Sequence, residues 1–279
     1  MNTQADDLIR IALEEDIGTG DRTTMATIPE DSMSKARIVA KSDVVVAGMP
    51  YFARVYELLD AGVSVTSMKD EGELVVAGTV VAEITGSTRS ILTGERVALN
   101  ILQRLAGVAT MTRRYADALA HVPTRVVDTR KTTPGMRAMQ KYAVRTGGGH
   151  NHRFGLDSGI LIKDNHITAC GSIQLAVERA RDEVPHLLKI QVETTTLQEV
   201  EAAVECSADV ILLDNMSAEM MTQAVKTVRS SQKNILTEAS GNVTLARIQR
   251  IAETGVDYIS VGALTHSVIA ADLSLEVLS

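Results

Sequence analysis

Basic residues gather in one short segment of an otherwise acidic chain. The whole chain carries a net charge of −7, yet residues 125–153 contain seven bases and a single acid, Asp128. The seven bases are Arg125, Arg130, Lys131, Arg137, Lys141, Arg145 and Arg153. An acidic protein that concentrates positive charge in this way is expected to bind an anionic ligand there.

Three of these bases have an alternative interpretation as part of a solvated helix. Arg137, Lys141 and Arg145 follow i, i+4 spacing, which places them on one helix face that water could cover. We favour that interpretation for these three. Arg130, Lys131 and Arg153 lie outside the predicted helix, and for them we keep the anion-binding interpretation.

Two carboxylates, Glu193 and Asp214, directly follow apolar runs that we interpret as adjacent strands. Because neighbouring parallel strands end at the same edge of a sheet, the two carboxylates should lie near each other. They could hold Mg²⁺ through waters and a substrate phosphate, or accept hydrogen bonds from ribose hydroxyls. Alternatively they could be ion-pair partners of Lys163 or Arg153, and both interpretations could hold.

Two steps of small residues follow the last two apolar runs. They are Ser240-Gly241-Asn242 and Val261-Gly262-Ala263, and each stands ahead of a predicted helix. Small residues let backbone N–H groups approach a phosphate, and barrels often bind phosphate at this place. One such step is usually only a turn, but two at the expected positions indicate a phosphate site, with His266 close behind the second.

A glycine run, Gly147-Gly148-Gly149, precedes another polar cluster. We interpret it as a helix stop followed by a flexible bend that presents Asn151, His152 and Arg153. His152 and His166 lie in polar runs near strand ends, where a role in the site is favoured.

The elements that must position these residues alternate between strand and helix after residue 120. The predicted strands are Arg125–Val127, Ile160–Ile162, Leu188–Val192, Val210–Leu213, Ile235–Thr237 and Tyr258–Val261. The predicted helices between them include Ser172–Val184, Leu197–Cys206, Ala218–Arg229 and Leu245–Glu253. This alternation predicts a parallel α/β sheet, and a barrel whose carboxyl rim collects the polar strand ends.

The first part of the chain has a different pattern. Short alternating runs at residues 35–40, 63–66 and 74–84, interrupted by glycine turns, predict a small and mostly antiparallel sheet. A long helix predicted over residues 88–119 joins the two parts.

Composition excludes several classes of protein. No run approaches the roughly 20 apolar residues of a membrane helix, and the acidic start of the chain is unlike a secretory signal. The negative charge argues against nonspecific binding to nucleic acid or membranes. Cys170 and Cys206 have no metal-binding spacing and suit a reducing compartment. We therefore expect a soluble cytoplasmic enzyme that acts on small anions.

Several motifs resemble the quinolinate phosphoribosyltransferase family (nicotinate-nucleotide pyrophosphorylase, carboxylating). They are Glu15-Asp16-Ile17-Gly18-Thr19-Gly20-Asp21, Glu95-Arg96, Asp128-Thr129-Arg130-Lys131-Thr132-Thr133-Pro134-Gly135, Lys141-Tyr142-Ala143-Val144, Gly147-Gly148-Gly149-His150-Asn151-His152-Arg153, Leu161-Ile162-Lys163-Asp164-Asn165-His166 and residues 255–267. The resemblance covers nearly the whole chain.

The resemblance implies an α/β fold with an N-terminal α/β sandwich domain and an incomplete parallel α/β barrel. We place the first domain at residues 1–115 and the second at 116–279, with a C-terminal tail that could return to the first. It implies phosphoribosyl transfer from phosphoribosyl pyrophosphate to quinolinate with loss of CO₂, a reaction of NAD biosynthesis that requires Mg²⁺. It also implies a homodimer, or a higher homo-oligomer, with shared active sites.

Site residues are carried over by matching motif positions. The quinolinate carboxylates would be gripped by Arg130, Lys131, His152, Arg153 and Lys163. The phosphate would be cradled by Ser240, Gly241, Asn242, Val261, Gly262 and Ala263. Also assigned to substrate are Thr129, His266 and, from the neighbouring subunit, Arg96. Glu193 and Asp214 would face the ribose and the metal, and Lys131 is a candidate acid for the decarboxylation.

Three positions depart from the family pattern, and two other functions stay open. Asn242 stands where glycine is common, Gln191 where an acid is frequent and Ala106 where serine is frequent. One alternative is a related phosphoribosyltransferase for another aromatic acid, which would lack part of the dicarboxylate clamp. The other is a noncatalytic protein that binds a phosphorylated metabolite, which would not need both Glu193 and Asp214.

Overall fold

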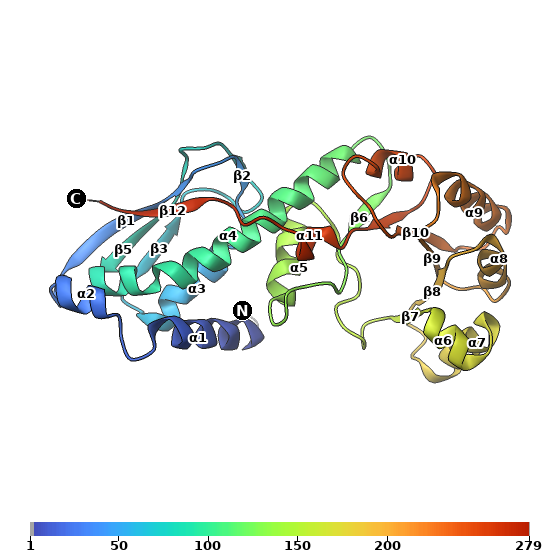
Figure 1. Cartoon of the computed structure of the whole chain (residues 1–279), viewed down its shortest axis with the longest axis horizontal. Coiled ribbons are helices and arrows are strands. Elements are labelled where there is room, and N and C mark those ends of the chain that lie inside the picture. Colours follow the sequence, from blue (N-terminus) through green and yellow to red (C-terminus); the bar gives the residue numbers. More distant parts are fainter. Residues whose placement is uncertain (1–2, 279) are drawn as a thin grey trace. The chain divides into compact units, whose positions relative to one another are not determined.

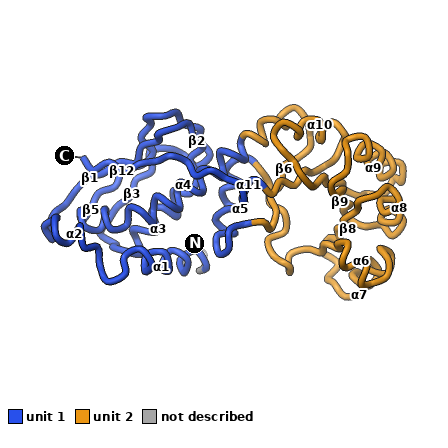
Figure 2. The backbone as a smooth tube through the Cα atoms, in the orientation of Figure 1, with its two compact units in different colours: residues 1–113, 132–148, 263–279 blue, residues 114–131, 149–262 orange. Residues whose placement is uncertain are grey.

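The structure of the protein is a computed structural model, which describes residues 3–278. The outer ends of the two predicted domains, residues 1–2 and 279, lie outside the described residues. Two compact units divide the chain (Figure 2). Unit 1 consists of Met1–Arg113, Thr132–Gly148 and Ala263–Ser279, and unit 2 of Arg114–Lys131 and Gly149–Gly262. The prediction allowed a C-terminal tail to return to the first domain, and Ala263–Ser279 does belong to unit 1. The segment Thr132–Gly148 also belongs to unit 1, although it was predicted in the second domain.

Unit 1 contains two antiparallel sheets. Its strands are β1 (Met33–Ala40), β2 (Val44–Val45), β3 (Ser64–Ser67), β4 (Leu74–Val75), β5 (Val80–Ser87) and β12 (Leu273–Leu278). Four of them form a sheet in the order β12-β1-β5-β3, and β2 pairs with β4. Ala36 and Ile38 are fully buried, as period-two alternation on a half-covered sheet requires. The C-terminal strand β12 pairs with β1 (Figure 1), with Lys35 opposite Leu278.

Unit 1 also contains helices, of which α1, α3 and α4 lie along one side of the four-stranded sheet (Figure 1). Those of unit 1 are α1 (Thr3–Ile17), α2 (Arg22–Thr27), α3 (Met49–Leu59), α5 (Arg137–Thr146) and α11 (Ala263–His266), while α4 (Thr88–Ala118) continues into unit 2. Helix α3 buries Phe52, Val55 and Tyr56 at helical spacing. It begins after Gly48, whose φ of 105° suits glycine and where a Cβ would lie 2.8 Å from Leu105.

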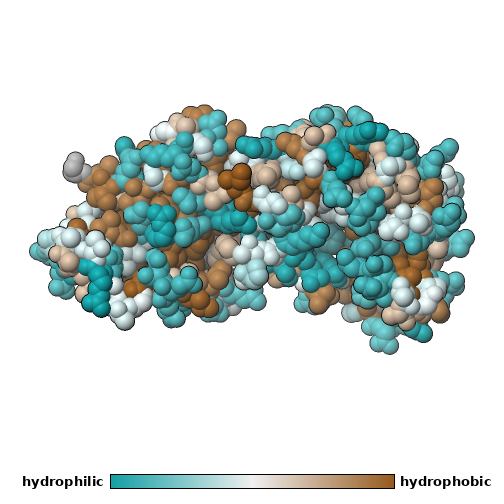
Figure 3. Space-filling model, viewed as in Figure 1, coloured by the Kyte–Doolittle hydropathy of each residue, from teal (hydrophilic) through white to brown (hydrophobic). Residues whose placement is uncertain are grey.

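The surface of unit 1 is not uniformly polar. Figure 3 shows hydrophobic residues reaching the surface beside hydrophilic ones. Large apolar side chains that stay exposed include Met33 at 69%, Leu74 at 59% and Val76 at 64%. Apolar side chains exposed singly are common on soluble proteins, and a contact surface is indicated only where they form a contiguous patch.

Unit 2 is built on a parallel sheet. Its strands are β6 (Arg125–Val127), β7 (Ile160–Ile162), β8 (Ile190–Thr194), β9 (Val210–Asp214), β10 (Leu236–Ser240) and β11 (Tyr258–Ser260). Their order is β6-β11-β10-β9-β8-β7, and each neighbouring pair is parallel, which leaves β6 and β7 at the two edges. The predicted fold class, a small sandwich domain with an incomplete α/β barrel, is confirmed.

Helices connect these strands and close the core of unit 2. They are α6 (Asp164–Cys170), α7 (Ile173–Glu183), α8 (Leu197–Glu205), α9 (Ala218–Ser230) and α10 (Ile248–Ala252). Helix α8 starts with a capping box in which Thr196 and Glu199 satisfy each other's backbone N–H groups, and it buries Val200 and Ala203. Among the described helices, none has an apolar stretch that would cross a membrane.

Candidate functional site

One cavity of unit 2 collects most of the side chains singled out from the sequence. It has a volume of about 440 Å³ and opens at the carboxyl ends of the central strands. The lining residues are Thr129, Arg130, Lys131, His152, Arg153, Leu161, Lys163, Glu193, Leu212, Asp214, Asn215, Glu238, Ser240, Gly241, Asn242 and Ser260. Eleven of these sixteen were predicted as site residues.

The alternation of side chains along each strand explains why these residues share the cavity. Successive residues of a strand point to opposite faces, so residues two apart point to the same face. On β9, Leu212 and Asp214 both line the cavity, and on β10 Glu238 and Ser240 do the same. The register places Glu193, Leu212 and Glu238 side by side across β8, β9 and β10. At the carboxyl ends of the strands, two levels of side chains therefore face the same cavity: Glu193, Leu212 and Glu238, and then Asp214 and Ser240.

Four cations line this cavity: Arg130, Lys131, Arg153 and Lys163. Burial and the neighbouring Arg130 guanidinium both lower the pKa of Arg153. Two like charges held close together disfavour each other, and a ligand with two carboxylates would relieve that repulsion. The arrangement is suited to a planar dicarboxylate.

The segment that carries His152 and Arg153 is fixed by a buried acid. Asp128 is fully buried, and its carboxylate accepts hydrogen bonds from the His152 backbone at 2.8 Å and from the Asn151 amide at 2.6 Å. His150 forms a parallel bridge with Val127 beside it. The helix does stop at the glycine run, but the predicted flexible bend is wrong, because these hydrogen bonds pin the segment to the end of β6.

His152 is held in one tautomer. The backbone N–H of Arg153 donates to His152 Nδ1 at 2.8 Å, so Nδ1 carries a lone pair and the ring proton is on Nε2. That nitrogen lies 3.1 Å from Gln191 Oε1 and 3.5 Å from Glu238 Oε2. Because the ring is neutral in this arrangement, we treat the longer contact as a polar contact and not as an ion pair.

The two carboxylates at the ends of β8 and β9 have separate partners. Glu193 Oε2 lies 3.2 Å from Lys163 Nζ, which is the ion pair that the sequence offered as an alternative. Asp214 Oδ2 accepts a 2.7 Å hydrogen bond from the Asn215 amide. Within residues 3–278, no three His, Cys, Asp or Glu side chains form a metal-binding group. Two hard oxygen donors suit a Mg²⁺ ion that keeps its waters and also binds substrate phosphates.

The loop after β10 is tightly folded against the end of β9. Gly241 has a φ of 91°, and a Cβ there would lie 2.9 Å from the Asn215 backbone nitrogen. Asn242 also has a positive φ, 49°, and its amide donates to Asn215 Oδ1 at 3.1 Å. The predicted helix start next to this loop is wrong, because α10 begins only at Ile248. Backbone N–H groups of the loop are therefore the remaining candidates for binding an anion.

Five predicted site residues are placed elsewhere. Of the residues described as lining the cavity, none is Arg96, Val261, Gly262, Ala263 or His266. Arg96, on α4, has 57% of its side chain exposed, and α11, which carries the last two, also belongs to unit 1. Val261 is buried and Gly262 half-buried in unit 2.

The solvated-helix interpretation is correct for only part of α5. Arg145 is exposed and Arg137 half-exposed, but Lys141 is only 4% exposed. Regular i, i+4 spacing places residues on one helix face but does not say what covers that face. The long Lys141 side chain is therefore buried where the spacing predicted water.

Five lining residues were missed as site residues, and most follow a simple rule. They are Leu161, Leu212, Asn215, Glu238 and Ser260. Leu161, Leu212 and Glu238 each stand two positions before a predicted site residue on or next to the same strand. Strand alternation applied backwards from the rim would have found them.

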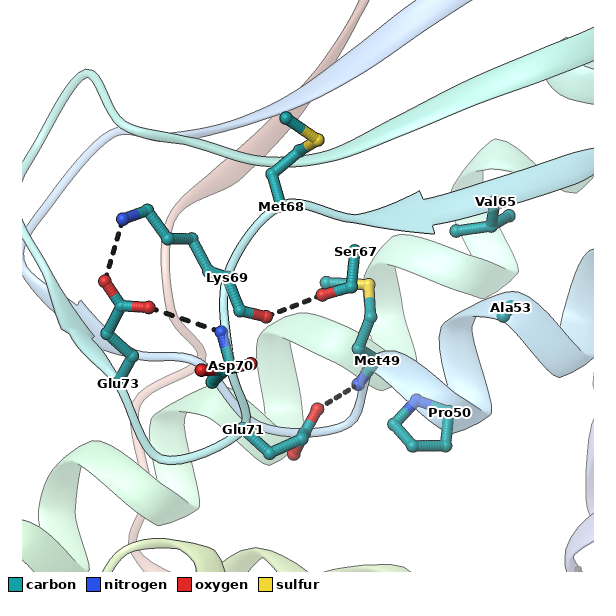
Figure 4. A pocket seen from close by; sticks show the side chains of 10 residues that line it. All are labelled: Met49, Pro50, Ala53, Val65, Ser67, Met68, Lys69, Asp70, Glu71 and Glu73. Carbon is teal, nitrogen blue, oxygen red and sulfur yellow. Dashed lines mark hydrogen bonds and ion pairs between the residues drawn. The ribbon is translucent and has the colours of Figure 1, made fainter.

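A second cavity, of about 500 Å³, lies in unit 1 and has no such character (Figure 4). Its Glu71 carboxylate already accepts hydrogen bonds from the backbone N–H groups of Gly48 and Met49 and from the Tyr142 hydroxyl. Burial first, and then Glu71, raise the pKa of Tyr142. Because this acid is satisfied within the protein, we assign the chemistry to the cavity of unit 2.

Comparison with protein families matches both parts of the chain. The model described as quinolinate phosphoribosyl transferase, N-terminal domain, matches residues 21–106. The model described as quinolinate phosphoribosyl transferase, C-terminal domain, matches residues 108–276. Together the two models span most of the sequence.

Individual proteins agree with these models. The chain is 49% identical over 265 residues to a probable nicotinate-nucleotide pyrophosphorylase (carboxylating) of Synechocystis, covering 95% of this chain and 90% of that protein. A Bacillus subtilis protein of the same description is 46% identical, covering 94% of this chain and 90% of its own length. The crystal structure of NadC from Streptococcus pyogenes superimposes with a TM-score of 0.93 at 42% identity, covering 99% of this chain and 98% of that one. The nicotinate-nucleotide pyrophosphorylase from Francisella tularensis superimposes with a TM-score of 0.94 at 40% identity, with coverages of 100% and 97%.

Proposed function

The chain belongs to the quinolinate phosphoribosyltransferase family, and we propose that the cavity of unit 2 is its active site. The protein is a carboxylating nicotinate-nucleotide pyrophosphorylase of NAD biosynthesis. It transfers the phosphoribosyl group of phosphoribosyl pyrophosphate to the ring nitrogen of quinolinate and releases pyrophosphate and CO₂ to give nicotinate mononucleotide. The placement of the active site rests on one observation, namely that four cations and two rim carboxylates line a single cavity.

The cations would bind the two carboxylates of quinolinate. Arg130 and Arg153 carry planar guanidinium groups that can donate two parallel hydrogen bonds to a carboxylate. Lys131 and Lys163 would add point charges on the same cavity wall. A monocarboxylate such as nicotinate would leave part of this positive charge unpaired, which favours the dicarboxylate.

The carboxylates would stabilise the sugar during transfer. As the bond to pyrophosphate breaks, positive charge develops on the ribosyl ring, and Glu193 and Asp214 lie in the cavity where they could stabilise it electrostatically. The new bond from the pyridine nitrogen to ribose leaves that nitrogen positively charged. The charged ring then accepts the electron pair released with CO₂, and a proton delivered to that carbon, with Lys131 as the candidate donor, completes the product.

We propose Mg²⁺ as the cofactor, held near Glu193 and Asp214 mainly through water. When bound with the substrate, the ion would neutralise charge on the departing pyrophosphate. The phosphate of the ribose would meet the backbone N–H groups of the loop at Gly241 and Asn242, with Ser240 beside them. The Mg²⁺ position is supported by the carboxylate oxygens at the rim, and the phosphate position by the glycine turn.

We also propose that the protein works as a homodimer or a larger homo-oligomer in the cytoplasm. Arg96 would complete the site of a neighbouring subunit, which agrees with its 57% exposed side chain and its position outside the unit 2 cavity. Exposed apolar side chains of unit 1, such as Met33 and Leu74, could be covered in an oligomer. The free cysteines Cys170 and Cys206 suit a reducing compartment.

The proposal is tested by turnover of the purified chain. We expect that quinolinate, phosphoribosyl pyrophosphate and Mg²⁺ together yield nicotinate mononucleotide and one CO₂ for each product. Chelation of Mg²⁺ should stop both signals, and added Mg²⁺ should restore them. Product that forms at the same rate in excess chelator would overturn the metal assignment, and CO₂ without nucleotide would overturn the transfer step.

A further inference from the structure

We propose that Gln191 and Glu238 are positioning residues that hold the His152 ring, and through it the Arg153 backbone, in the carboxylate-binding part of the site. This inference rests on the proposed function, because it concerns the grip on quinolinate. Neither residue was predicted to bind substrate. Both are nearly buried, with 6% and 4% of their surface exposed.

A continuous set of hydrogen bonds connects the four residues. Gln191 Nε2 donates to Glu238 Oε2 at 2.9 Å, so the glutamine amide nitrogen points to the acid. Gln191 Oε1 then faces His152 Nε2 at 3.1 Å, and His152 Nδ1 accepts the Arg153 backbone N–H at 2.8 Å. Gln191 and His152 each donate on one side and accept on the other, while the Arg153 N–H only donates and Glu238 only accepts.

The direction of these bonds is fixed from both ends. A backbone N–H can only donate, so the Arg153 end requires a lone pair on His152 Nδ1 and a proton on Nε2. A carboxylate can only accept, so the Glu238 end requires the amide nitrogen of Gln191 on its side. Both requirements are satisfied at Gln191 Oε1, which accepts a hydrogen bond from the N–H at His152 Nε2. Turning the amide over would break the bonds on both sides.

This arrangement changes the role expected of His152. The family resemblance implies that His152 grips a quinolinate carboxylate, but its Nε2 proton is directed to Gln191 and its Nδ1 to the Arg153 backbone. Asp128 holds the His152 backbone N–H as well. The residue is therefore clamped at its ring and its backbone, and Arg153, next in the chain, supplies the positive charge.

The state of Glu238 indicates more than a packing role. Its Oε1 atom is buried, and within residues 3–278 it has no hydrogen-bond partner. A buried carboxylate oxygen without a partner destabilises a fold. A glutamine here could present either its oxygen or its amide nitrogen to Gln191, whereas a carboxylate can only accept. We infer that the charge of Glu238 is kept because it orients the Gln191 amide.

The first test determines the His152 tautomer in the parent protein and uses a variant only to assign the signals. Nitrogen-15 NMR of side-chain imidazoles distinguishes the two neutral tautomers, and the chain has only six histidines, so His152 can be assigned by comparison with His152→Asn. We expect the proton of His152 on Nε2 in the unliganded protein at neutral pH. A proton on Nδ1 would overturn the inference, whether or not the protein turns over quinolinate.

The second test removes the hydrogen bonds of the Gln191 amide and compares the effect with the loss of a similar Gln–Glu hydrogen bond outside the site. Gln191→Met keeps the length of the side chain but removes the amide, while Gln174→Met removes a Gln–Glu hydrogen bond of the same 2.9 Å on an exposed helix face. We expect Gln191→Met to shift the His152 signals and to raise KM for quinolinate about tenfold, with KM for phosphoribosyl pyrophosphate nearly unchanged. Glu238→Met should act in the same way from the other end, and Gln174→Met should do neither.

Three results would contradict the proposal. One is that the nitrogen-15 signals of His152 are the same as in the parent protein in both variants, although both variants are folded. Another is a KM for quinolinate equal to that of the parent protein. The third is an equal rise in both KM values, which would indicate general damage. Loss of all quinolinate turnover in the parent protein would instead contradict the proposed function, and the NMR result would still decide the positioning role.

Discussion

Lys163 Nζ lies 3.2 Å from Glu193 Oε2, so a cation assigned to the quinolinate carboxylates is paired with an acid assigned to the ribose and metal. Lys163 keeps 49% of its side chain exposed, and ion pairs of this exposure contribute little to stability. The pair holds the two charges near each other, and under the proposed function the substrates would separate them. Binding of quinolinate and of Mg²⁺ should release the two partners together.

The first prediction follows from this pair. Lys163→Met should lower kcat/KM for quinolinate about 100-fold, because it removes a charge that contacts a substrate carboxylate. Lys163→Arg should lose less, since it keeps the charge. The free energy of unfolding should change by less than about 1 kcal/mol in both. Steady-state kinetics and urea unfolding measure the two effects, and a kcat/KM of Lys163→Met within threefold of the parent value would contradict the assignment.

A second prediction concerns the loop at Gly241. Gly241→Ala would add a Cβ 2.9 Å from the Asn215 nitrogen at a φ of 91°, so the loop must move. Gly78→Ala is the matched control, because Gly78 has a φ of 89° and nothing within 4 Å of an added Cβ. Backbone strain of roughly 1 kcal/mol should appear in both variants. Only Gly241→Ala should raise KM for phosphoribosyl pyrophosphate, by about tenfold. Equal KM values in the two variants would remove this loop from the phosphate site.

The sequence predicted the strand–helix alternation well because each unit is local in the chain. The six parallel strands were placed within a few residues, and their polar ends do meet at one cavity. The link from His152 to Gln191 and on to Glu238 was not predicted, because it joins residues 39 and then 47 positions apart. Such a link depends on strand order and register, which local patterns do not specify.

The errors have the same physical origin. Glycines after a helix predict a flexible bend when only the local chain is considered, but the bridge of His150 to Val127 and the hydrogen bonds to Asp128 fix the segment. The spacing around Lys141 predicts a solvated face, yet that side chain is buried. In both cases a tertiary contact overrides a local pattern.

A third prediction concerns stability at low pH. Burial would raise the pKa of Asp257, but hydrogen bonds from Arg229 and Thr237 outweigh it and hold the pKa below its usual value. Its stabilising effect is therefore complete above the unfolded value of about 3.9 and is lost as pH falls through the lower folded pKa. Asp257→Asn should cost about 1 to 2 kcal/mol of unfolding free energy at pH 7 and progressively less below about pH 4.

Urea unfolding at neutral and acidic pH measures this dependence. The control is Asp182→Asn, a change at an exposed acid on α7, which should leave the unfolding free energy unchanged at both pH values. Activity at pH 7 should be kept in Asp257→Asn, because Asp257 is not among the residues described as lining the proposed active site in unit 2. If Asp257→Asn lowers the unfolding free energy by the same amount at neutral and acidic pH, the lowered pKa of Asp257 does not contribute to stability as argued.

A fourth prediction tests the shared site. Arg96→Ala and Lys163→Ala subunits should each be nearly inactive alone. If Arg96 serves the neighbouring subunit, a mixed dimer carries one site with both defects and one intact site. Random exchange should then restore about a quarter of the parent activity. Differently tagged subunits verify that mixed dimers form, and no recovery in purified mixed dimers would place Arg96 outside the shared site.

The central claim is that the cation-lined cavity of unit 2 selects a dicarboxylate for phosphoribosyl transfer. The most direct measurement offers quinolinate and nicotinate in parallel to the purified chain, with phosphoribosyl pyrophosphate and Mg²⁺, and follows nucleotide and CO₂. We expect nicotinate mononucleotide from quinolinate alone, with one CO₂ for each product. Turnover of nicotinate instead of quinolinate would contradict the dicarboxylate grip, and turnover of neither acid would contradict the enzymatic assignment itself.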